Sequence, residues 1–336
     1  MPAVRSLTAQ LFTFGPHAGA HRVAARAAVT VAVALVTLWA LDRTEWSIYA
    51  AFGAFTSLYG RHDVHRGRLQ MQVSVGLVLV ASVVAGTAVG LADQRAWLVV
   101  PTAALLAGVG AALSDLQGWH PPGPLFPVFA FTACASVPSQ PGDLPVALLV
   151  SAATAGLALL IGGVGGYGRA WRDPSLRTRP RPATVEAVQT RHVLRAVLGV
   201  LVAGSVATAA GIGHPYWAMV SAVVPLAAPN LEAGLHRGVQ RVLGTAAGLV
   251  LAGVLLELDL PHLGLVAVVV VLQAAAELLI GRNYAVALVA VTPLALLMVD
   301  LMASVPTRTL LLDRGVETVI GVLVGVGVAW LTRRRD

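Results

Sequence analysis

The sequence has no lysine, so all 23 of its basic residues are arginine. A P-loop grips phosphate with a lysine, and a Schiff-base enzyme forms its covalent bond through one, so neither class of protein is expected. Cysteine is nearly absent as well, with Cys134 the single example. One cysteine cannot form an intrachain disulfide or a thiolate metal site. The histidines show no metal-ligand spacing either, so we expect no metal and no cofactor.

Charged residues make up only 12% of the 336 residues, whereas 57% are apolar. A soluble chain of ordinary composition has roughly a quarter of its residues charged. Here the apolar residues form long runs separated by short charged breaks, and one membrane-spanning helix takes about 20 apolar residues. The sequence therefore predicts an all-α polytopic membrane protein with about twelve transmembrane helices. Most arginines flank apolar runs, which is typical of membrane topology, so the lipid bilayer is the expected partner and nucleic acid is not.

The apolar runs divide into two groups of six around a polar segment that prolines interrupt. Both groups start with paired arginines, Arg22 and Arg26 in the first and Arg191 and Arg195 in the second. In each group a tryptophan, Trp46 or Trp217, precedes a His-Arg-Gly triplet by the same number of positions. Six is an even number, so both copies enter the membrane from the same side, which makes the repeat parallel.

Arginine also predicts the orientation, because cytoplasmic loops carry an excess of positive charge. The expected organisation has both termini on the cytoplasmic side of the cell (plasma) membrane. Its parts are a cytoplasmic N-terminal segment at 1–21, a first six-helix repeat at 22–168, a cytoplasmic basic linker at 169–191, a second six-helix repeat at 192–332 and a cytoplasmic tail at 333–336.

Two pairs of predicted spans are irregular at matching places in the two halves. The second and eighth runs, at about 46–60 and 215–230, are shorter than a full span. The fifth and eleventh are interrupted by Pro127 and Pro293. Broken helices at corresponding positions point to a transporter's substrate site, because freed backbone groups line a polar cavity there. The alternative is that these prolines are only kinks.

Several charged residues are expected inside the membrane boundary. Arg195 lies a turn inside on the cytoplasmic side, where it either reaches the lipid headgroups or joins Arg241 and Arg282 in a basic mouth for an anion. Glu317 lies about a turn below the outer interface, with Arg314 on the same helix face. We interpret Glu317 either as a proton acceptor or as the partner that neutralises Arg314.

Two aromatic residues are candidates for the same site. Trp217 is expected at the end of a span, where an aromatic belt is the ordinary interpretation. Together with Tyr284 it is alternatively a surface on which an aromatic substrate stacks.

Three motifs carry a resemblance to a known family: Arg241-Val-Leu-Gly244-Thr245-Ala-Ala-Gly248, Gly281-Arg282-Asn283-Tyr284, and Arg314-Gly-Val-Glu317-Thr318-Val-Ile-Gly321. The chain resembles the fusaric-acid-resistance family of inner-membrane proteins, which are aromatic acid exporters related to plant aluminium-activated malate transporters. The motifs are clear in the second half and degraded in the first, where Val73 stands in place of Gly244. The resemblance implies proton-driven export of organic anions, typically aromatic carboxylates. It also implies that Arg241 and Arg282 face the anion and that Glu317 has a coupling or structural role.

The leading hypothesis is a proton-coupled efflux transporter that binds a small organic anion through Arg241, Arg282, Tyr284, Arg195 and Trp217. A passive anion channel and a membrane scaffold subunit that does not transport are the alternatives. An enzyme is not expected, since the polar loops contain no nucleophile–base pair or metal set. The oligomeric state stays open, with a homo-oligomer among the options.

Overall fold

The computed structural model describes residues 13–17, 19–61, 66–172, 188–258, 260–301 and 306–333. All regular elements in these ranges are helices, and two of them, η1 (Thr44–Trp46) and η2 (Phe55–Leu58), are short 3-10 turns. The α-helices are α2 (Ala20–Ala40), α3 (Ser47–Ala54), α4 (Arg66–Gly90), α5 (Arg95–Gln117), α6 (Leu125–Ser136), α7 (Asp143–Arg172), α8 (Thr190–Ala209), α9 (Tyr216–Leu226), α10 (Leu231–Leu256), α11 (His262–Leu279), α12 (Tyr284–Asp300) and α13 (Thr307–Leu331). Most of the N-terminal segment, the middle of the linker and the last three residues of the tail lie outside the described ranges.

Eight of these helices are long and apolar enough to cross a membrane: α2, α4, α5, α7, α8, α10, α11 and α13. The other four, α3, α6, α9 and α12, are shorter, with 8, 12, 11 and 17 residues. The all-helical class is thus confirmed for the described residues, whereas only eight of the twelve expected spans have full length. The four short helices occupy the second, fifth, eighth and eleventh positions along the chain, which are the positions where the sequence predicts irregular runs.

Prolines account for part of this pattern. Pro225 is the penultimate residue of α9, and the side chain of Asn230 caps the start of α10 by accepting from the backbone N–H of Ala233. Pro293 lies inside α12. Pro127, by contrast, is the third residue of α6. The first turn of a helix needs no proline N–H. The expectation that Pro127 interrupts its helix is therefore wrong, because this proline lies in the first turn of the helix.

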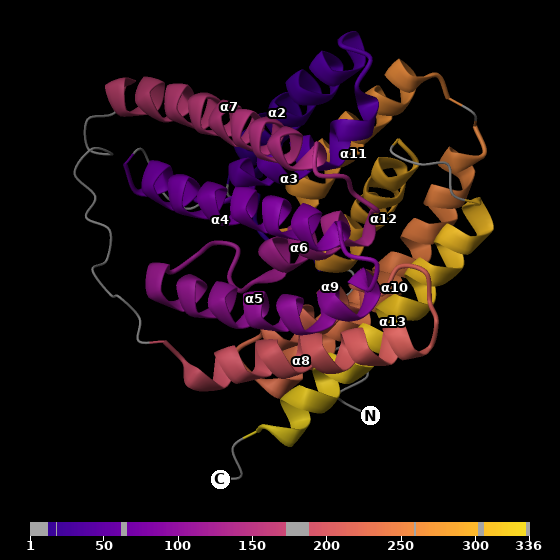
Figure 1. Cartoon of the computed structure of the whole chain (residues 1–336). Coiled ribbons are helices and arrows are strands. Elements are labelled where there is room, and N and C mark those ends of the chain that lie inside the picture. The colour runs from indigo at the N-terminus through magenta and orange to yellow at the C-terminus, as the bar shows by residue number, and fades with distance from the viewer. Residues whose placement is uncertain are drawn as a thin grey trace.

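The two halves of the chain pack against each other through the first and fourth helix of each half. Figure 1 shows α5 alongside α8, and the other such contact joins α11 to α2. Two polar pairs also join the halves, one between the segment after η2 and α11 and the other within the contact of α5 with α8. Arg61 Nη2 lies 3.0 Å from Glu277 Oε2, and His192 Nδ1 lies 2.8 Å from Asp115 Oδ1. Each half therefore completes its packing with a helix from the other.

Within the second half, α10 packs against α12 and α13, and α13 packs against α9. Glycines bring these backbones close together. A Cβ at Gly244 of α10 would lie 2.3 Å from the carbonyl oxygen of Ala285 in α12, and one at Gly321 of α13 would lie 2.2 Å from that of Ala218 in α9. Such small-residue contacts are the usual way in which helices pack closely inside a membrane. Through these contacts the short helices α9 and α12 pack directly against the long helices α13 and α10.

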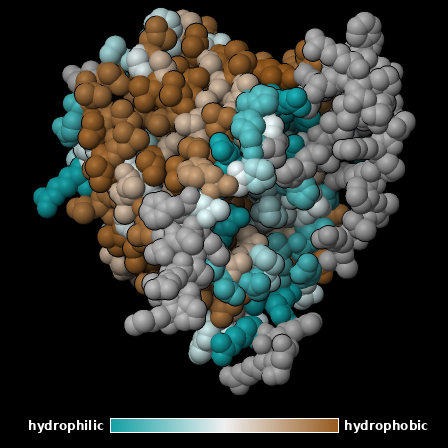
Figure 2. All heavy atoms as spheres, turned by 180° about the vertical axis from the view of Figure 1, so that it is seen from behind, coloured by the Kyte–Doolittle hydropathy of each residue, from teal (hydrophilic) through white to brown (hydrophobic). Residues whose placement is uncertain are grey.

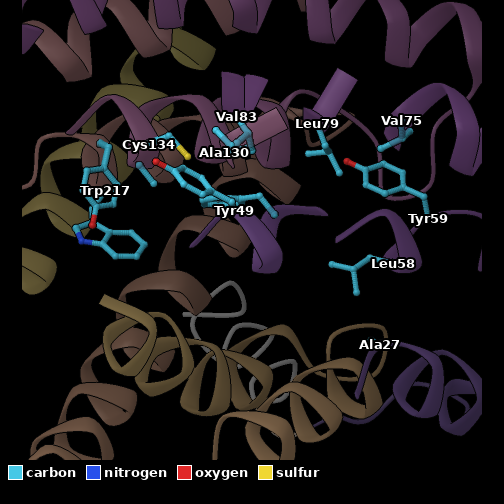
Figure 3. Close-up of a cluster of buried hydrophobic side chains, with 14 of the residues drawn as sticks. Ala27, Tyr49, Leu58, Tyr59, Val75, Leu79, Val83, Ala130, Cys134 and Trp217 are labelled. Atoms are coloured by element: carbon cyan, nitrogen blue, oxygen red, sulfur yellow. The ribbon is translucent and has the colours of Figure 1, made fainter. Parts of the chain in front are cut away.

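Aromatic side chains fill the interior between the halves. The ring of Phe129 on α6 lies 5.0 Å from Phe52 of the first half and 5.1 Å from Trp217 of the second, measured between ring centroids. Figure 3 shows this buried cluster, with Tyr59 and Trp217 at its two ends. On the outside, large apolar side chains such as Leu105 and Val250 are exposed, and Figure 2 shows a broad hydrophobic surface of this kind. Such a surface is the kind that a lipid bilayer covers.

Candidate functional site

The candidate site lies where α9, α10, α12 and α13 meet in the second half. Its most buried cation is Arg314 of α13, which is 1% exposed. The guanidinium carbon lies 3.8 Å from the ring centroid of Trp217, which is a close cation–π contact. Two of its nitrogens, Nε and Nη1, are buried and have no hydrogen-bond partner among the residues that the structure describes. Because arginine stays charged, these donors remain available to an acceptor that enters the site.

Arg241 of α10 is the second buried cation, at 4% exposure. Its Nε donates to Ser221 Oγ of α9 at 3.0 Å, and its Nη1 donates to Tyr284 Oη of α12, also at 3.0 Å. The exposed Arg237, one turn earlier on α10, lies with its guanidinium carbon 5.1 Å from the Tyr284 ring centroid. Arginines thus extend from the exposed end of α10 to the interior of the bundle.

Glu317 of α13 is the anionic member of this group and is fully buried. Its Oε1 accepts from the backbone N–H of His214 and its Oε2 from that of Trp217, both at 3.1 Å. None of the ion pairs in the described part of the chain joins Glu317 to Arg314. The carboxylate therefore binds the start of α9 and not the neighbouring guanidinium.

Further polar atoms of the same four helices also lack partners. They are Trp217 Nε1 of α9, Thr245 Oγ1 of α10 and Thr292 Oγ1 of α12, all buried. Thr245 follows Arg241 by one helical turn, so the two residues share a face of α10. Buried polar groups are normally hydrogen-bonded, so these exceptions are further atoms to which a ligand could bind.

The structure brings five of the seven predicted site residues into this group: Arg241, Tyr284, Trp217, Arg314 and Glu317. The other two lie elsewhere. Arg282 is in the turn between α11 and α12, where its Nε donates to the backbone oxygen of Gly15 at 3.3 Å.

Arg195 of α8 donates to the end of α13. Its Nε reaches Thr332 Oγ1 at 2.6 Å, and its Nη2 reaches the backbone oxygens of Ala329 and Thr332 at 3.3 and 3.2 Å. A helix end has free carbonyl groups that such a side chain satisfies. The geometry thus gives Arg195 a structural contact with α13.

Sequence reasoning missed two members of the group, Ser221 and Arg237. Helical spacing could have identified both residues, since Ser221 follows Trp217 by four positions and Arg237 precedes Arg241 by four. It also expected Trp217 in an interfacial belt as the ordinary interpretation, whereas its side chain is 1% exposed. Among the described residues there is no group of three or more histidine, cysteine, aspartate or glutamate side chains that could hold a metal ion.

Comparison with known proteins finds a family model that resembles this half of the chain. Residues 198–328 match the family model described as fusaric acid resistance protein-like. The second half of the chain is therefore similar to proteins of this family. The matched region spans every member of the site, from Trp217 to Glu317, whereas Arg195 lies outside it.

Two relatives match parts of the chain at 31% identity. One is "Uncharacterized protein slr1298" of Synechocystis sp. (strain ATCC 27184 / PCC 6803 / Kazusa), matched over 151 residues, which are 44% of this chain and 19% of that protein. The other is "Uncharacterized membrane protein YvaC" of Bacillus subtilis (strain 168), matched over 130 residues, which are 38% of this chain and 21% of that protein. The matched region thus spans about a fifth of each relative's length. No solved structure matches the chain.

The apolar helices and the match to the fusaric acid resistance protein-like model together make this chain a multi-pass membrane protein.

Proposed function

We propose that the chain is a secondary transporter of the plasma membrane that exports small organic anions, and that the anion binds between Arg241 and Arg314. The observation that carries this proposal is the buried guanidinium of Arg314, whose Nε and Nη1 have no partner in the described part of the chain. A buried charge with unpaired donors is unfavourable unless a ligand binds it. An anionic ligand supplies both the charge and the acceptors.

The charges of the group favour a ligand with one negative charge. The group has two buried guanidiniums, Arg241 and Arg314, and one buried carboxylate, Glu317. The formal charge of these three buried side chains is therefore positive by one. A carboxylate ligand fits this excess because its two oxygens accept from guanidinium nitrogens in parallel. Trp217 and Tyr284 give the same place an aromatic wall, which favours an aromatic carboxylate among organic anions.

We place the entrance at Arg237 and Tyr284 and not at Arg282, which the sequence had grouped with Arg241. Arg237 is exposed and lies over the Tyr284 ring, and the Tyr284 hydroxyl accepts from Arg241. An anion that passes along this side of α10 meets one arginine after another. Such a series attracts an anion from the cytoplasm while no single residue holds it too tightly to release.

The proposed membrane organisation is two parallel repeats of six helices with both termini cytoplasmic. It is supported by packing that recurs in the two halves: α4 packs on α6 and α7 as α10 packs on α12 and α13. The contacts of α5 with α8 and of α11 with α2 are likewise counterparts. Half-length helices at matching positions of two repeats are a feature of secondary transporters.

Flux in proteoliposomes of the purified protein tests the function. Hydroxybenzoate and malate are offered separately, with and without a pH gradient, at clamped membrane potential. Uphill accumulation that needs the pH gradient is expected, and Arg241→Gln should abolish it while Arg282→Gln should not. Downhill flux that ignores the gradient would instead show a passive channel. An absence of flux for a wide panel of anions would favour the alternative of a scaffold subunit that does not transport.

A further inference from the structure

The N-terminus of α9 has backbone N–H groups that need hydrogen-bond acceptors. An α-helix begins with backbone N–H groups that have no partner within the helix, and inside a membrane no water satisfies them. The first turn of α9 packs inside the bundle, with Tyr216 and Trp217 both buried. Its capping position is held by Pro215, and no side chain of its own segment accepts a hydrogen bond there.

Glu317 of α13 supplies acceptors for this end of α9. Its two oxygens accept from two different amides, those of His214 and Trp217, at 3.1 Å each. The Trp217 amide shares its hydrogen with the carbonyl oxygen of His214, which is 3.0 Å away. The carboxylate thus lies at the positive end of the α9 dipole, where a negative charge is favourable. Both oxygens are engaged as acceptors, so a proton on either one would face an N–H donor.

The two side chains that α9 contributes to the anion site lie in its first two turns, next to this contact. Trp217 carries the ring over Arg314, and Ser221, one turn later, accepts from Arg241. We infer that Glu317 is a positioning residue that fixes the first turn of α9, and through it the groups that hold both site arginines. The inference rests on the proposed function for its effect on anion binding, although the contact with α9 is independent of it. It differs from both interpretations drawn from the sequence, since Glu317 neither carries the transported proton nor pairs with Arg314.

Hydrogen–deuterium exchange of the full-length protein in nanodiscs tests the contact directly. In Glu317→Gln one accepting oxygen is replaced by an NH₂ group, which cannot accept. Loss of one charge-assisted hydrogen bond should speed exchange of the amides at 214 and 217 by about tenfold or more. Glu317→Asp keeps the charge but has a shorter reach, so its amides should exchange at intermediate rates. The matched control is Thr318→Val, because Thr318 donates only to Arg314 of its own helix, and it should leave these amides unchanged.

Transport of the same variants separates positioning from proton transfer. If Glu317 positions the site, Glu317→Gln raises the anion concentration for half-maximal transport, and uphill and downhill flux fall together. Unchanged amide exchange in Glu317→Gln would overturn the inference, and so would a variant that loses only uphill accumulation while its downhill exchange and anion affinity stay normal. Failure of the wild type to bind any anion would refute the proposed function alone, because the exchange result is judged without transport.

Discussion

Replacing Arg314 by methionine should keep or raise the stability of the protein without ligand and weaken its binding of anions. The side chain is buried with two unpartnered donors, and each buried unsatisfied donor costs about 1–3 kcal/mol. Methionine has similar length and removes both penalties. It also removes the cation–π contact with Trp217, which is worth about 2 kcal/mol when desolvated. The relief equals or exceeds the loss, so Arg314→Met should be at least as stable as the wild type without ligand.

The effect on anion binding has the opposite sign. A hydrogen bond to a charged group contributes about 1.5–3 kcal/mol, so losing one weakens the affinity by about 10- to 150-fold. An anion at 100 times its Kd stabilises the wild type by about 2.7 kcal/mol. If the variant binds 100-fold more weakly, the same concentration stabilises it by only about 0.4 kcal/mol.

Thermal unfolding in detergent, with and without hydroxybenzoate or malate, measures both effects at once. The expected result is an unchanged or higher unfolding temperature without anion and a nearly lost anion-induced shift. Arg195→Met is the control, because Arg195 contacts the end of α13 and not the site. It should lower the unfolding temperature and keep the shift. If Arg314→Met unfolds several degrees lower and still responds to the anion that stabilises the wild type, Arg314 is structural and the reasoning is refuted.

Two further predictions concern the scaffold. Gly321→Ala places a Cβ 2.2 Å from a backbone oxygen of α9, so it should destabilise the protein by about 1–3 kcal/mol or more. Gly327→Ala on the same helix meets nothing within 4 Å and should stabilise it slightly, and equal unfolding temperatures for the two variants would contradict the packing. Arg61→Met leaves Glu277 buried without its partner and should cost about 3–5 kcal/mol, whereas the double variant Arg61→Met/Glu277→Leu should recover most of that loss. A double-mutant cycle in thermal unfolding checks this, and additive effects would show that the pair is not coupled.

The sequence predicts position along a helix better than position around it. Apolar runs separated by charged breaks reveal the helices, and the count of apolar residues between charges predicts that Glu317 lies below the membrane surface. Neither pattern says which helices become neighbours. Arg241 and Arg282 were therefore grouped because both lie at the inner ends of helices. The fold instead turns Arg241 toward α9 and α12, while Arg282 stays in a turn beside Gly15.

The role of Glu317 was beyond sequence reasoning for a related reason. Spacing within α13 shows that Arg314 shares its face, which makes an ion pair the obvious expectation. The actual partners are backbone amides of a different helix, and backbone donors leave no trace in the side-chain pattern. Trp217 was misplaced in the same way, since the first residues of an apolar run look like a membrane interface when the run is a short helix that begins inside the bundle.

The exchange of helices between the two halves has a consequence for shorter chains. A protein with only one half would leave two helix faces bare, one on its first helix and one on its fourth. A second copy of the same half would cover both faces, because the first helix of each copy would pack against the fourth helix of the other. The arrangement seen within this single chain is thus also the geometry of an obligate dimer of half-length subunits.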